Sequence, residues 1–217
     1  MARARIPELP RWRKPAGWIT AAAVLLALFP PFHIRPHDAV SENEGAGALD
    51  VPAVAERFWN EKLLSPGVRP VDVRPLVAAL VQDPARAAEK YGRRAGVGGK
   101  TFFLASGIGH IASVDHRGAW IDVDGSESPR ILLLTGPVFG NALRDVTGLL
   151  SLSDYRSADF EALSTALDRL AETRAQPALR ALGAGASISF LAAGEIDDAS
   201  QALPVFRLAP IRVEVHP

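Results

Sequence analysis

The 217-residue sequence predicts an α+β fold that is mainly β, with short helices before the strands and an apolar segment near the N-terminus. Three observations predict it. Apolar residues recur at helical spacing between residues 52 and 91, and they alternate with polar residues from residue 101 onward. A glycine cluster at residues 96–99 separates the two patterns. With 48% hydrophobic and 22% charged residues, the chain suits one compact domain with appendages.

The first 34 residues predict entry into a membrane. Residues 1–15 form a basic tail with five cations and one anion, and residues 16–34 are apolar and carry no charge. The positive-inside tendency keeps the tail cytoplasmic and places the rest of the chain in the periplasm. An uncleaved single-pass anchor in the inner membrane is favoured over a cleaved signal segment, because the nearest small-x-small triplet, Ala39-Val40-Ser41, lies far downstream. The remaining alternative is a buried N-terminal helix of a soluble protein.

The composition of the rest of the chain excludes some classes of partner and some kinds of covalent attachment. Without the basic tail, 19 basic and 23 acidic residues remain, a balance that argues against nucleic acid as a partner. The sequence has no cysteine, so it can form neither a disulfide nor the diacylglycerol anchor of a lipoprotein. Residues 35–50 are polar, contain glycine and lack a hydrophobic period, which is typical of a tether. The folded extracytoplasmic part is therefore expected over residues 51–217.

The folded part is expected to begin with helices and to continue with five strands around one more helix. In chain order, the expected elements are helices at 52–64 and 72–91, strands at 101–115, 119–124 and 130–138, a helix at 159–175, and strands at 186–196 and 203–215. Asp83-Pro84 is expected to break the second helix, because a residue before proline avoids helical geometry. Asp159 is the expected N-cap of the long helix.

This order of elements predicts a specific β architecture. Three strands, a helix and two strands, with a long first strand that bends, are what the five-stranded oligonucleotide/oligosaccharide-binding (OB) barrel requires. Gly107 and Gly109 lie in the middle of the first strand, where a strand can bulge or bend sharply. We therefore expect an OB-like barrel preceded by two or three short helices and an N-terminal membrane helix.

Four stretches of the sequence carry a family resemblance: Asp83-Pro84 with Lys90-Tyr91-Gly92, Val114-Asp115, the block from Gly136 to Asp145, and the closing stretch from Pro204 to Val213. Together they resemble a bacterial family of predicted periplasmic lipoproteins of unknown function. The resemblance covers about residues 51–215 and rests mainly on the 136–145 block. Members of the family tend to be encoded beside sugar ABC transporters, which implies a transporter-associated role. The chain departs from the family in lacking the lipobox cysteine.

No pattern of catalytic or metal-binding residues stands out. There is no serine in a Gly-x-Ser-x-Gly elbow and no thiol nucleophile. The spacing of Asp122, Asp124 and Glu127 does not match a calcium loop. His110 and His116 share a strand face, but six residues of extended chain separate them by roughly 20 Å. The sequence therefore predicts no metal and no cofactor.

Two functional hypotheses follow. The first is a non-catalytic accessory or binding module, held at the inner membrane, that contacts a sugar ABC transporter or its substrate-binding protein. The second is a small carbohydrate-processing enzyme that uses barrel-face carboxylates, with Asp115, Asp122 or Asp145 as acid or base.

The 136–145 block is the expected binding surface. Gly136, Pro137 and Gly140 fix the backbone more closely than a simple exit loop requires. The block also supplies one amide and an opposite-charge pair, from Asn141, Arg144 and Asp145. The planar guanidinium of Arg144 could bind a carboxylate or a pair of sugar hydroxyls. In the alternative, Arg144 and Asp145 only brace the loop.

Overall fold

The structure is a computed structural model that describes residues 49–94, 99–123, 131–196 and 205–217. The predicted basic tail, membrane segment and most of the tether lie outside these residues, as do the predicted turns at 125–129 and 197–200. None of the helices in the described ranges is both long and apolar enough to cross a membrane. The folded part forms one compact unit that starts at Leu49.

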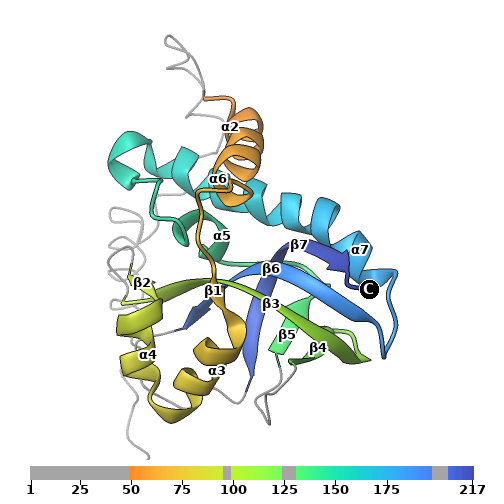
Figure 1. The fold of residues 1–217 in the computed structure, drawn as a ribbon. Helices are drawn as coiled ribbons and strands as arrows, with labels where there is room; N and C mark the ends of the chain where they lie inside the picture. The colour runs from red at the N-terminus through yellow and green to blue at the C-terminus, as the bar shows by residue number, and fades with distance from the viewer. Residues whose placement is uncertain (1–48, 95–98, 124–130, 197–204) are drawn as a thin grey trace, which may run out of the picture. The chain divides into compact units, whose positions relative to one another are not determined.

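Seven strands form a single sheet (Figure 1). They are β1 (Val71–Asp72), β2 (Arg93–Arg94), β3 (Thr101–Val114), β4 (Gly118–Val123), β5 (Ile131–Leu134), β6 (Ser187–Ile196) and β7 (Phe206–Val215). The pairings run from β3 through β4, β5, β7 and β6 and return to β3, with only the β5–β7 pair parallel. The five long strands correspond to the five predicted ones. β1 and β2 were not predicted, and both pair with β3.

β3 pairs with β6 and with β4, and two glycines lie where other chain segments approach it closely. Its residues 101–110 pair with β6, and residues 109–114 pair with β4. Gly109 belongs to both pairings, and a Cβ at this position would lie 2.6 Å from the backbone oxygen of Asp122. A Cβ at Gly107 would lie 2.4 Å from a methyl group of Val73 in α3. The two glycines predicted to shape this strand are thus both sites of close approach.

Helices cover both faces of the sheet. The helical elements are α2 (Val51–Phe58), the π-helical turn η2 (Trp59–Leu63), α3 (Val73–Gln82), α4 (Pro84–Tyr91), α5 (Ala142–Asp145), the 3₁₀ turn η3 (Leu152–Asp154), α6 (Ser157–Leu170), the π-helical turn η4 (Ala171–Ala175) and α7 (Gln176–Arg180). Figure 1 shows α3 and α4 on the side of the sheet opposite to α2 and α6. Asp83 ends α3 and caps α4, whose first residue is Pro84, so the predicted break is confirmed.

Each face of the sheet has its own core. Along β3, Phe103 and Ala105 pack with α3 and α4, whereas Phe102 and Leu104 pack with α2 and α6. Trp59 is 1% exposed in the second core, and Phe103 meets Phe206 edge to face in the first. Because both faces are covered there, residues 101–105 of β3 and 190–194 of β6 are buried on both sides, unlike a strand that faces water on one side.

Two local predictions were wrong. The long helix begins at Ser157 with Arg156 as its N-cap, and Asp159 lies inside the first turn, where it binds the Arg156 side chain instead of the backbone. The third strand is shorter than expected, because β5 ends at Leu134. After Leu134 the chain leaves the sheet, and side chains of α6, η4 and α7 form hydrogen bonds with the segment that follows.

Candidate functional site

A row of side chains fixes the segment that leaves β5. Glu172, Gln176 and Arg180 lie four residues apart along η4 and α7. Gln176 donates to the carbonyl of Gly136 at 2.7 Å, and Arg180 donates to the carbonyl of Thr135 at 3.0 Å. The amide of Val138 donates to Glu172 at 2.8 Å. These bonds replace the sheet hydrogen bonds that the segment has given up, and they hold its backbone in one place.

The loop that follows carries a prominent apolar side chain. Phe139 is 85% exposed, although both its neighbours are constrained. Val138 is buried in the core, and Gly140 has a φ of +116°, a backbone conformation that side-chain-bearing residues rarely adopt. A phenyl ring held in water on a fixed loop contributes nothing to the core. Single exposed apolar side chains are common on protein surfaces, so what distinguishes Phe139 is the fixed backbone on both sides of it.

A cavity of about 570 Å³ lies between this loop and α6. The loop contributes Val138 to Asn141, and the helical side contributes Glu161, Ala162, Ser164, Thr165, Asp168, Arg169 and Glu172. Its lining therefore has three carboxylates and one guanidinium. Glu161 is already paired with Arg144, so Asp168 and Glu172 are the carboxylates that give the cavity its acidic character.

Asp168 is the most unusual group in the cavity. It is 8% exposed, and no hydrogen bond joins its carboxyl group to another residue in the described part of the chain. Burial raises the pKa of Asp168 to about 7, helped by the negative charges of Glu172 and Glu195 and opposed by Arg144. Near neutral pH the carboxyl group is thus poised between its neutral and charged forms.

Glu195, in β6, extends the acidic character beneath the loop. One of its carboxylate oxygens is bound by Lys100, while the other is buried without a hydrogen-bond partner among the described residues. A Cβ at Gly140 would lie 3.5 Å from this second oxygen, so the carboxylate lies directly against the loop backbone. Three carboxylates, Asp168, Glu172 and Glu195, thus interact electrostatically around the 138–141 loop.

The structure brings together some of the predicted site residues and separates others. Gly140 and Asn141 line the cavity, and the Asn141 side-chain oxygen accepts a hydrogen bond from Ser164 at 3.1 Å. Gly136 and Pro137 lie before the loop, in the segment fixed by Gln176. All four lie in the segment that carries Phe139 and one wall of the cavity.

Arg144 and Asp145 lie in α5 and point into the protein. They are 5% and 7% exposed, and the guanidinium forms two hydrogen bonds to the Asp145 carboxylate at 2.8 and 2.9 Å. The same guanidinium lies 3.8 Å from the centre of the Phe160 ring and donates to the Phe160 carbonyl. This geometry favours the bracing role: the pair joins α5 to the start of α6.

The three carboxylates of the enzyme hypothesis lie in different surroundings. Asp115 accepts hydrogen bonds from Arg117 and Trp120, and these bonds lower its pKa well below the ordinary range. It therefore remains ionised and cannot act as a general acid. Asp145 is bound by Arg144, and Asp122 is exposed on β4. Within the described ranges, no group of three His, Asp or Glu side chains is arranged to hold a metal ion.

The fold and the site together define a small α+β protein with a fixed aromatic loop beside an acidic cavity. A family described as "Predicted periplasmic lipoprotein (DUF2291)" matches residues 22–214, and the chain belongs to this family. A solved structure from Thermotoga maritima, described as an OB-fold protein, is similar with a TM-score of 0.69 and 21% identity. The similarity covers 78% of this chain and 100% of the other. No curated protein matches the sequence.

Proposed function

We propose that the protein is a non-catalytic accessory module of the bacterial cell envelope, which docks through the 138–141 loop onto a component of a sugar ABC transporter, such as its substrate-binding protein. The family membership supports a periplasmic location. The choice of a sugar transporter as partner rests on the family resemblance described in the sequence analysis, which implies a transporter-associated role.

The exposed Phe139 is the observation that carries the proposal. Aromatic side chains are enriched at the centres of protein interfaces, where a few of them provide most of the binding energy. Docking is most favourable when the contact residue is already ordered, because less conformational entropy is then lost. The hydrogen bonds from the Val138 amide to Glu172 and from Gln176 to the Gly136 carbonyl provide this order in the unbound protein.

The charge of the cavity indicates the chemistry of the partner. Asp168 is buried, and its carboxyl group has no hydrogen-bond partner in the described part of the chain, so it can accept one from a partner protein. A lysine or arginine side chain entering beside Phe139 would provide donors to Asp168 and Glu172. Pairing of this kind favours one partner over others and accelerates encounter. We therefore propose a partner surface with an apolar pocket flanked by basic side chains.

Attachment to the membrane is proposed through the N-terminal apolar segment. Residues 16–34 follow a basic tail, and the sequence has no cysteine to carry a lipid. A single-pass helix with a cytoplasmic N-terminus would keep the folded domain near a transporter in the same membrane. The polar residues 35–50 would provide the reach between helix and domain.

Co-purification from crosslinked membranes of the native host tests this function. The full-length protein should retain a sugar transporter component, identified by mass spectrometry, and Phe139→Ala should lose it. Leu152→Ala is the matched control, because Leu152 is also exposed, at 54%, but lies outside the cavity. Equal recovery with both variants, or recovery of proteins unrelated to transport, would refute the proposal.

A further inference from the structure

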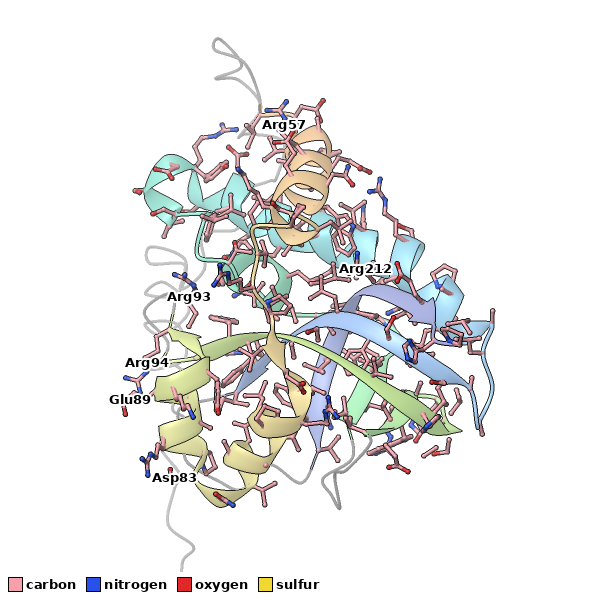
Figure 2. All side chains as sticks on the ribbon, viewed as in Figure 1. Arg57, Asp83, Glu89, Arg93, Arg94 and Arg212 are labelled. Atoms are coloured by element: carbon pink, nitrogen blue, oxygen red, sulfur yellow. The ribbon has the colours of Figure 1, made fainter. Side chains whose placement is uncertain are left out.

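A second cavity, of about 630 Å³, is lined by charged side chains of the opposite sign. Some of its lining residues, Val146, Thr147 and Leu149, follow α5 in the sequence. Its lining includes Arg69, Arg93 and Arg94, and no carboxylate is among the described residues that line it. None of the three guanidinium groups takes part in an ion pair or hydrogen bond within the described part of the chain. Figure 2 shows the side chains of Arg93 and Arg94 at one edge of the domain, beside β2.

The position of Arg93 is built into the fold. Residues 93 and 94 form β2, which pairs with the start of β3, so the backbone of both arginines is held by the sheet. Gly148 has a φ of +63°, and a Cβ on it would lie 2.3 Å from a guanidinium nitrogen of Arg93. The guanidinium thus packs against the bare backbone of Gly148, where any larger residue would displace it.

The rest of the lining provides neutral polar and apolar groups. Tyr91 and Thr147 add hydroxyl groups, and Phe102 and Leu104 of β3 form part of an apolar lining. The described residues that line the cavity carry three positive charges and no negative one, so the cavity favours an anion. Two of these charges, on Arg93 and Arg94, are on a strand whose backbone is paired with β3.

We propose that this cavity, named here the arginine cavity, binds the phosphate group of a small phosphorylated molecule or of a lipid headgroup. Guanidinium groups bind phosphate through paired hydrogen bonds. A tetrahedral phosphate can accept from several forks arranged around it, whereas a flat carboxylate best matches a single fork. The volume exceeds that of phosphate alone and leaves room for an organic group against Phe102 and Leu104. The proposal is independent of the docking function of the 138–141 loop.

Isothermal titration of the full-length protein in neutral detergent, at fixed ionic strength, tests the proposal with inorganic phosphate as the probe. Arg69→Gln/Arg94→Gln should weaken phosphate binding by roughly tenfold or more, because it removes two charged donors and leaves the packing of Arg93 on Gly148 intact. Arg57→Gln/Arg86→Gln is the matched control, since it removes two exposed charges outside the cavity and should change binding by less than about twofold. Melting temperatures of the variants confirm that each remains folded.

A second experiment distinguishes a lipid headgroup from a soluble phosphorylated molecule. Binding to phosphatidylcholine vesicles that contain phosphatidylglycerol, but not to pure phosphatidylcholine vesicles, would identify a lipid headgroup if Arg69→Gln/Arg94→Gln abolishes it. Phosphate binding without vesicle binding would identify a soluble phosphorylated ligand. The proposal is overturned if neither probe binds, if acetate binds as tightly as phosphate, or if the control pair weakens binding as much as the cavity pair.

Discussion

Replacing Asp168 by asparagine should change how the stability of the protein depends on pH. Burial and the nearby charges of Glu172 and Glu195 raise the pKa of Asp168 to about 7 in the folded state, from an ordinary value of 3.8. Between these two values the folded protein holds a proton that the unfolded chain has released. Stability therefore falls as pH rises through this window. Asparagine has nearly the same shape as the protonated carboxyl group and does not titrate.

The size of the effect follows from the difference between the two pKa values. One pKa unit corresponds to 1.36 kcal/mol, so the full window gives a ceiling of roughly 4 kcal/mol. Between pH 5 and pH 7, we expect the free energy of unfolding of Asp168→Asn to gain about 2 kcal/mol relative to the wild type. At pH 8 the variant should be the more stable protein, because it no longer buries a charge beside Glu172 and Glu195.

Urea denaturation of both proteins at pH 5, 6, 7 and 8, followed by tryptophan fluorescence, measures this difference. Trp59 is buried in the core beside α6 and reports on unfolding of this region. Asp154→Asn, at an exposed position, is the control and should give a difference that does not vary with pH. A flat difference for Asp168→Asn as well would show that the carboxylate is ionised normally in the folded protein, and the acidic cavity would lose its proposed character.

Three further predictions concern the fold, the brace and the topology. Gly109→Val should lower the free energy of unfolding by about 1–3 kcal/mol, because the new side chain clashes with the Asp122 carbonyl. Gly183→Val is the control: this glycine has open space around it, so the same urea titration should show a loss of well under 1 kcal/mol. Arg144→Ala should lower the free energy of unfolding by about 3–5 kcal/mol, because it leaves the buried Asp145 carboxylate unpaired. The exposed Arg156→Ala should lower it by about 1 kcal/mol or less. An unchanged melting temperature of Arg144→Ala with lost partner binding would instead place Arg144 in the binding surface. Alkaline phosphatase fused after Pro217 should be active in the native host, and an inactive fusion would contradict the predicted orientation.

The parts of the fold that depend on local chemistry could be predicted from the sequence. Asp83 before Pro84 predicts the break between α3 and α4, because aspartate caps a helix and proline suits its first turn. The alternation of Ala119, Ile121 and Val123 with Trp120 and Asp122 predicts which side of β4 is buried. Gly109 marks the point where β3 passes from one partner strand to the other.

The parts of the site that depend on contacts between distant segments could not be predicted. Arg144 and Asp145 are neighbours in the sequence, but only the packing of α5 on Phe160 shows that both are buried. Phe139 lies in the predicted block, yet its exposure follows from the bonds that Glu172 and Gln176 make more than thirty residues away. A partial signal was present, since the four-residue spacing of Asp168, Glu172, Gln176 and Arg180 places polar groups along one side of a helix.

Site-specific photo-crosslinking in living cells tests the docking of the 138–141 loop most directly. A photoreactive phenylalanine analogue at position 139 of the full-length protein retains the aromatic ring at a position that is 85% exposed. The same analogue at position 152 provides the control outside the cavity. We expect illumination to join position 139, and not position 152, to one component of a sugar ABC transporter, and Asp168→Lys to abolish the product. Absence of a discrete product at position 139, or the same products from both positions, would contradict docking through this loop.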